Sequence, residues 1–154
     1  MAKKESQDVD KEDMKQVIKN FPGQIKKAFK LGQGIKIDDE IQKIVVGGMG
    51  GSALPGEILK SYLSDTRTPI HINRNYFLPE FVDSKTLVFV ISYSGNTEET
   101  INMYRHARRK GCKVVAISSG GKLRMLADKN NTPHIRVPGG IEPRSAYGYL
   151  FFSL

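Results

Sequence analysis

Apolar side chains before residue 31 recur every three to four positions, which is the spacing of one face of a helix. Pro22 interrupts this pattern, because proline has no N–H for the helix interior. The pattern therefore predicts a helix over residues 12–31 that either bends at Pro22 or divides into two. The apolar positions are Met14, Val17, Ile18, Phe21, Ile25, Ala28 and Phe29.

Beyond Gly34, short apolar runs alternate with helical patterns. The run TLVFVIS (86–92) is continuous and rich in β-branched residues, which is typical of a strand buried on both faces. Strands that alternate with helices indicate a parallel sheet with helices on both faces. The predicted strands are 43–48, 68–73, 86–92, 113–118 and 133–138; the predicted helices are 53–63, 97–110, 122–129 and a last one that begins at Pro143.

The length of 154 residues suits one domain with a sizeable core. Residues 1–10 are polar and predict a flexible tail, and residues 11–154 predict a single domain. The apolar runs are a handful of residues long, far below the ~20 that a membrane-spanning helix needs, so we expect no membrane association. No apolar segment of signal-peptide type stands near the start, and the single cysteine, Cys112, fits a reducing compartment. We expect a cytoplasmic location.

The 24 Lys and Arg outnumber the 16 Asp and Glu, which gives a net charge of +8. Such an excess favours anionic ligands, either nucleic acids or small phosphorylated molecules. The densest basic cluster, residues 105–110, comes just before Gly111, where cations complement the dipole of a helix end. Aromatic residues do not interleave with the basic ones and no nucleic-acid motif is present, so we expect no nucleic-acid binding.

Three loops that follow predicted strands are rich in glycine and hydroxyl groups. They are GGMGGS (47–52), SYSGNT (92–97) and SSGGK (118–122). In an open parallel sheet, ligands bind beyond the carboxyl ends of the strands, and each of these loops leads into a helix N-terminus there. One such loop is explained as a turn with a cap, but three at one edge favour a phosphate site.

Several other sites fit the sequence less well. The first loop lacks the lysine of a P-loop, and Ala53 and Leu54 stand where a dinucleotide motif needs its third glycine. The spacing of His, Cys, Asp and Glu suggests no metal site. We expect Glu99 to form a capping box with Asn96, and we expect structural roles for His71, His106 and His134 and an inert thiol at Cys112.

The motifs GMGGS (49–52 with the preceding glycine), SYSGNTEET (92–100), ISSGGKL (117–123) and PGGIEPRSAYGY (138–149) resemble the sugar isomerase (SIS) domain. More narrowly, they resemble the bifunctional phosphoglucose/phosphomannose isomerases. The resemblance begins near residue 12 and extends through Leu154. It implies a flavodoxin-like, doubly wound α/β fold with a five-stranded parallel sheet and an N-terminal helix.

The same resemblance implies the roles of particular residues. The substrate would be a hexose 6-phosphate, whose phosphate would be held by Ser92, Ser94 and Thr97. Gly50, Gly51 and Ser52 would lie against the sugar. Arg144 would stabilise the cis-enediolate that forms as a proton moves between C1 and C2, a role that suits its permanent charge and paired donors. The resemblance implies no metal and no organic cofactor.

Family members are about twice as long, and their glutamate base comes from a second domain. The chain is therefore expected to be the N-terminal half of such an isomerase and to catalyse poorly alone. Two alternatives remain open: a stand-alone sugar-phosphate sensor or regulatory module, and one subunit of a split isomerase. The last helix ends in large apolar residues, Tyr149, Leu150, Phe151 and Phe152, so we expect a second copy to cover them in a homodimer.

Overall fold

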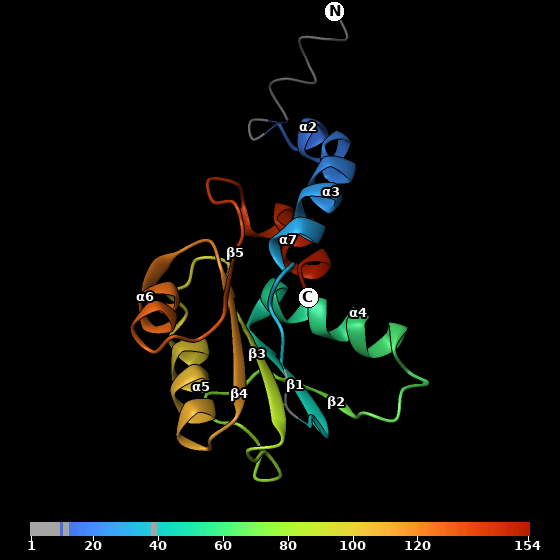
Figure 1. Cartoon of the computed structure of the whole chain (residues 1–154). Helices are drawn as coiled ribbons and strands as arrows, with labels where there is room; N and C mark the ends of the chain where they lie inside the picture. Colours follow the sequence, from blue (N-terminus) through green and yellow to red (C-terminus); the bar gives the residue numbers. More distant parts are fainter. Residues whose placement is uncertain (1–9, 11–12, 38–39) are drawn as a thin grey trace, which may run out of the picture.

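The computed structural model describes Asp10, residues 13–37 and residues 40–154. Its centre is a parallel sheet of five strands in the order β2-β1-β3-β4-β5 (Figure 1). The order reverses between β1 and β3, as it does in flavodoxin-like folds, so the predicted fold class is confirmed. The strands are β1 (Lys43–Gly48), β2 (Ile70–Asn73), β3 (Thr86–Ile91), β4 (Lys113–Ser118) and β5 (His134–Arg136).

Helices cover both faces of the sheet, as the alternation predicts. Figure 1 shows α5 (Glu98–Arg109) and α6 (Gly121–Lys129) on one face, and α4 (Leu54–Tyr62) on the other. A 3₁₀ turn at Gly50–Ala53 precedes α4, so that helix begins later than the glycine-rich loop. None of these helices, nor any other in the described part of the chain, combines the length and apolar character needed to cross a bilayer.

The alternation of side chains along the strands divides the core into two layers. Leu87 and Ile91 of β3 point to the layer beneath α3, α4 and α7, whereas Val88 and Val90 point to the layer beneath α5 and α6. All four are buried. A strand buried on both faces requires the continuous apolar run that residues 86–92 show.

The N-terminal helical pattern divides into two helices. The first, α2, spans Met14–Lys19, and the second, α3, spans Phe21–Leu31. Pro22 lies in the first turn of α3, where a backbone N–H has no partner within the helix, so the missing N–H of proline costs no hydrogen bond. The division into two helices, one of the two predicted arrangements, is therefore the observed one. The predicted tail over residues 1–10 falls outside the described residues except for Asp10, whose carboxylate accepts hydrogen bonds from Met14 N and Lys15 N.

The last apolar segment forms a short helix, α7 (Tyr147–Phe152), after a 3₁₀ turn at Pro143–Ser145. The expectation that a second copy must cover this helix is wrong for most of it, because α3 of the same chain packs against it. Tyr149 and Leu150 are buried, and the rings of Phe29 and Phe152 lie 5.5 Å apart. Figure 1 shows α3 and α7 side by side above the end of the sheet from which α4 departs.

Candidate functional site

A cavity of about 360 Å³ lies at the carboxyl ends of β1 and β3, where the strand order reverses. The loop after β1, the loop after β3 and the 3₁₀ turn before α7 contribute its walls. This is the position where ligands bind in open α/β sheets. The lining residues are Met49, Gly51, Ser52, Tyr93, Ser94, Thr97, Pro143 and Arg144.

The loop after β3 is held by its own hydroxyl groups. Ser92 is buried, and its Oγ accepts a hydrogen bond from Gly95 N at 3.1 Å and lies 2.9 Å from Thr97 Oγ1. Ser94 Oγ accepts a hydrogen bond from Asn96 N. A hydroxyl has one hydrogen to donate. When Ser92 donates its hydrogen to Thr97, the hydrogens of Ser94 and Thr97 both remain for a ligand in the cavity.

The loop after β3 is also joined tightly to the loop after β4. Gly95 has a φ of +71°, and a Cβ at this position would clash with the carbonyl oxygen of Gly120. Its own carbonyl accepts a hydrogen bond from Leu123 N at 2.8 Å. Only glycine combines this backbone conformation with such a close approach. The conformation of the hydroxyl-rich loop is therefore fixed by contact with a second loop.

The predicted capping box between Asn96 and Glu99 is wrong. Asn96 Oδ1 instead accepts a hydrogen bond from Lys122 N in the first turn of α6, at 3.0 Å. Thr97 is the residue that precedes α5, and its side chain makes no capping bond. Asn96 therefore accepts a hydrogen bond from a free N–H group at the N-terminus of a different helix, α6. The spacing of residues along the sequence does not reveal this partner.

The N-terminus of α5 lies against the cavity, since Thr97 lines it. The first intrahelical hydrogen bond runs from Ile101 N to Thr97 O, so the N–H groups just before Ile101 are unpaired within the helix. Together with the helix dipole they favour an anion. The carboxylates of Glu98 and Glu99 lie near Tyr76, whose phenol pKa is raised first by burial and then by these two charges.

Tyr93 is a site residue that the sequence analysis missed. Its backbone N donates to Ser52 Oγ at 3.4 Å, and its carbonyl accepts from Ser119 N and Ser119 Oγ. Its phenol oxygen donates to Pro138 O and accepts from Ile141 N, both at 3.2 Å. One residue thus connects all the loops around the cavity. The only signal in the sequence is an aromatic residue between two serines, which does not identify its partners.

The loop after β4 depends on a buried hydroxyl and an imidazole. Ser118 Oγ donates to Gly120 O at 2.9 Å and lies 2.8 Å from His134 Nε2, so the imidazole is the donor in the second bond. Burial is the largest influence on the pKa of His134 and lowers it. The charge of Asp128 raises this pKa, and the charges of Arg124 and Arg136 lower it. His134 therefore has the structural role that the sequence predicts.

The structure brings most of the predicted site residues together. Ser52, Ser94, Thr97 and Arg144 line the cavity, as does Gly51; Gly50 is the next residue, with a φ of +52° and open space beside it. Ser92 lies behind the loop and supports Thr97 rather than facing the cavity. Arg144 is the single cation among the lining residues that the structure describes.

The remaining candidates lie away from the cavity. His106 Nδ1 accepts a hydrogen bond from Leu78 N at 3.0 Å, and burial together with nearby Lys110 lowers its pKa. Burial raises the pKa of the Cys112 thiol, which disfavours the reactive thiolate. Within the described residues, no three His, Cys, Asp or Glu side chains are placed to hold a metal ion.

Glycine loops, hydroxyl groups, a helix N-terminus and an arginine at the switch point of a doubly wound sheet define a class of protein: an α/β domain that binds a small anionic ligand. The family is narrower. The chain belongs to the SIS domain family, whose model matches residues 39–139.

Relatives of known activity are similar to this chain over most of its length. It is 45% identical over 141 residues to a bifunctional phosphoglucose/phosphomannose isomerase of Caldicellulosiruptor bescii, covering 89% of this chain and 42% of that protein. It is 40% identical to a D-glucosamine-6-phosphate 4-epimerase of Sulfolobus acidocaldarius, covering 71% of this chain and 35% of that protein. The chain thus spans less than half the length of these relatives.

The fold is shared with solved structures. The crystal structure of a putative phosphosugar isomerase from Clostridium difficile 630 superposes with a TM-score of 0.71 at 20% identity, covering 90% of this chain and 42% of that one. At this level of identity the likeness concerns the fold alone. It agrees with the five-stranded parallel sheet described above.

Proposed function

We propose that this chain is the hexose-6-phosphate-binding domain of an aldose–ketose isomerase that interconverts glucose 6-phosphate, or mannose 6-phosphate, with fructose 6-phosphate. The observation that carries the proposal is the cavity at the switch point, where Ser94, Thr97 and the N-terminus of α5 face Arg144. The names of the similar relatives supply the sugar class.

The phosphate is expected to lie on the loop after β3. The hydroxyls of Ser94 and Thr97 donate to its oxygens, and Ser92 leaves the Thr97 hydrogen available by donating to Thr97 Oγ1. The unpaired N–H groups of the first turn of α5 add further donors and a favourable dipole. Gly50 and Gly51, which have open space beside them, let the sugar approach the backbone closely.

In the reaction, a base removes the proton from C2 of the aldose while the electron pair moves onto the carbonyl oxygen at C1. The product of this step is a cis-enediolate with its charge on O1 and a hydrogen on O2. Once that hydrogen moves from O2 to O1, the electron pair on O2 forms the C2 carbonyl and C1 takes the proton back from the base, which gives the ketose. Arg144 holds the developing oxyanion with the paired donors of its guanidinium cation. No metal or organic cofactor is needed for these steps.

Among the described residues that line the cavity there is no carboxylate and no imidazole. This observation favours a chain that binds the substrate and takes its base from elsewhere. Following the family resemblance, we infer that the base is a glutamate of a second domain, so that this chain corresponds to the N-terminal half of the isomerase. The same observation suits a sugar-phosphate sensor, which needs binding without proton transfer.

Calorimetry with fructose 6-phosphate tests the binding proposal. The chain is expected to bind fructose 6-phosphate saturably and to show no detectable binding of fructose. Ser94→Ala should weaken binding at least about 10-fold, because a hydrogen bond to a charged group is lost. Ser64→Ala is the matched control, since the Ser64 hydroxyl is exposed and, within the described part of the chain, bonds to the adjacent Asp65 alone. If the folded chain binds no sugar phosphate saturably, the binding proposal is rejected. If this chain alone isomerises the sugar rapidly, the inference that the base comes from a second domain is rejected.

We also propose a homodimer in the cytoplasm, where phosphorylated sugars are metabolised. The support for self-association now comes from α4, on which Leu54, Ile58 and Tyr62 repeat every four residues and are exposed by 46%, 42% and 82%. An exposed apolar stripe of this kind is typical of an interface. Light scattering that shows a well-behaved monomer would contradict the dimer.

A further inference from the structure

We propose that Gln24 of α3 is a positioning residue for Arg144. The inference deepens the proposed function, because it rests on the role given there to Arg144. Its basis is one long-range contact: Gln24 Nε2 donates a hydrogen bond to the backbone carbonyl of Ser145 at 2.9 Å. Gln24 is 121 residues away along the chain and only 6% exposed.

The turn that carries Arg144 has little structure of its own. It is a 3₁₀ turn of three residues, closed by bonds from Ser145 N to Glu142 O and from Ala146 N to Pro143 O. The glycine-rich loop before it contains Gly140, which has a φ of +82° and open space beside it. A segment of this kind keeps an arginine in place only when other elements hold it.

The two N-terminal helices hold the far side of this turn. The Ser145 carbonyl bonds to Gln24, and the Ser145 hydroxyl approaches Met14 Sδ at 3.5 Å. Arg144 itself borders a second, apolar hollow formed by α2, α3 and Tyr147, besides the polar cavity. Arg144 therefore stands between the helical wall and the phosphate loops.

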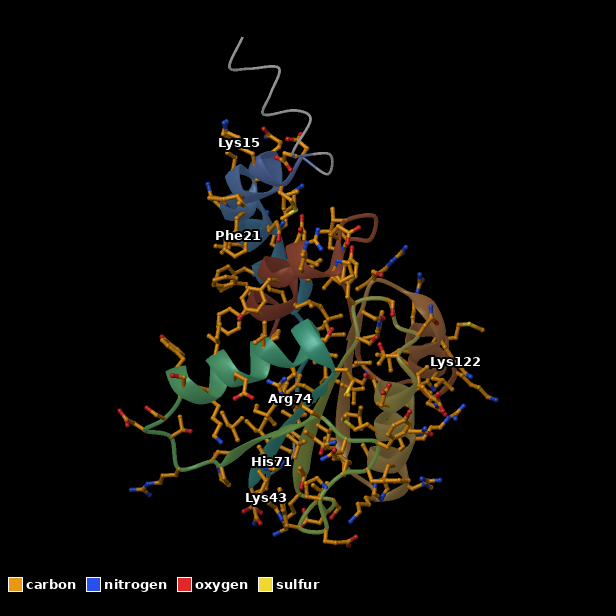
Figure 2. The ribbon with its side chains drawn as sticks, turned by 180° about the vertical axis from the view of Figure 1, so that it is seen from behind. Lys15, Phe21, Lys43, His71, Arg74 and Lys122 are labelled. Carbon is orange, nitrogen blue, oxygen red and sulfur yellow. The ribbon has the colours of Figure 1, made fainter. Side chains whose placement is uncertain are left out.

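The packing around Gln24 leaves little room for a different arrangement. Gly148 of α7 lies so close that a Cβ there would be 2.9 Å from Gln24 Oε1 and 3.0 Å from the ring of Phe21. Figure 2 shows Phe21 on α3 directed toward α7, which agrees with this tight crossing. The amide of Gln24 thus has a fixed orientation relative to the turn before α7.

The chemistry of the amide argues against a packing role. Gln24 Oε1 is buried and has no hydrogen-bond partner among the described residues, a cost that an apolar side chain of the same size would avoid. What the amide provides in return is the bond to Ser145 O. Both Gln24 and Arg144 also lie outside residues 39–139, the part that matches the family model. The contact is therefore an addition to the core SIS architecture.

The test is a double-mutant cycle between Gln24→Met and Arg144→Met, read by calorimetry with fructose 6-phosphate and with inorganic phosphate. Methionine keeps the length of the side chain and removes its donor. Gln24→Met should weaken fructose 6-phosphate binding about 10-fold, leave inorganic phosphate binding within about 2-fold, and have no further effect in the Arg144→Met background. Ser153→Ala, which removes a buried hydroxyl that has no partner among the described residues, should change neither affinity.

An equal effect of Gln24→Met in both backgrounds, or equal weakening of both ligands, would overturn the positioning role. Amide hydrogen exchange of the free protein supplies a measurement that needs no ligand. Gln24→Met should increase exchange in residues 143–148 and leave residues 92–97 unchanged, and unchanged exchange at 143–148 would also overturn the proposal. A wild-type chain that binds no sugar phosphate would reject the proposed function, while the exchange comparison would still decide whether Gln24 holds the turn.

Discussion

Two walls of the cavity are built in different ways: the first wall is the loop after β3, and the second wall is the turn that carries Arg144. The loop after β3 is held by bonds among its own residues and by contact with the loop after β4, which follows the neighbouring strand. The turn around Arg144 is held by single side chains from distant parts of the sequence, Tyr93 on one side and Gln24 on the other. The first wall is therefore held by loops of neighbouring strands, whereas the second is held by side chains from distant parts of the sequence.

Under the proposed function, this difference separates the part that binds the phosphate from the part that acts in the reaction. A phosphate needs a rigid group of donors, and the sheet edge supplies one within the part of the chain that matches the family model. In the proposed reaction the arginine needs a defined position relative to the reacting carbons, and it lies on a segment that the helices α2 and α3 support. We therefore expect changes in the first wall to affect every phosphate ligand, and changes in the second to affect the sugar part alone.

Gly95→Ala should have the largest effect, because Gly95 lies where the loop after β3 contacts the loop after β4. The substitution combines a φ of +71° with a clash against Gly120 O, and it should lower the free energy of unfolding by about 3 kcal/mol or more. Gly140→Ala in the second wall also has a positive φ but open space, so it should cost only about 1 kcal/mol. Urea denaturation measures both, and equal losses would contradict the role of the close contact.

Thr97→Val should remove one phosphate donor and leave the fold intact. The change keeps the shape of the side chain, and it should weaken fructose 6-phosphate and inorganic phosphate alike, by about 10-fold. Calorimetry with both ligands measures this. If only fructose 6-phosphate is affected, Thr97 belongs functionally to the sugar side and the division of the two walls fails.

Tyr93→Phe should act on the second wall from the phosphate side. Loss of the phenol oxygen removes the bonds to Pro138 O and Ile141 N and leaves the backbone bonds of Tyr93 in place. We expect fructose 6-phosphate binding to weaken about 3- to 10-fold, with inorganic phosphate nearly unchanged and faster hydrogen exchange at 138–145. Slower or unchanged exchange there would show that the phenol does not hold the turn.

The smallest effect concerns pH. The pKa of His134 is lowered by burial, so the unfolded chain takes up a proton at a higher pH than the folded chain does. The stability from neutral His134 is complete above its unfolded pKa of about 6.5 and is lost as the pH falls below it toward the lower folded pKa. Denaturation from pH 7.5 to 5 should show this loss, and His134→Gln should reduce it. His106, whose pKa is also lowered, contributes a slope of the same sign and serves as the comparison.

The elements and the binding edge were predictable from local patterns. All five strands appear where apolar runs predict them. The three central strands, β1, β3 and β4, are mostly buried, and a strand buried on both faces requires such a run whatever its neighbours are. The glycines and hydroxyls after β1, β3 and β4 likewise indicated the binding edge, since parallel strands place their carboxyl ends together. The ends of β2 and β5 differ from the prediction by up to two residues, because the hydrogen-bond ladder of an edge strand ends with its single neighbour.

The sequence by itself thus determined the doubly wound sheet, the edge proposed to bind phosphate and the presence of Arg144 near a turn. Only the tertiary structure decided which side chains hold the site together. Asn96 caps a helix 26 residues further along, Tyr93 bonds to backbone groups 45 and 48 residues away, and Gln24 bonds to one 121 residues away. Local propensity carries no information about such partners, because each bond exists only after the sheet and the helices have brought the two segments together.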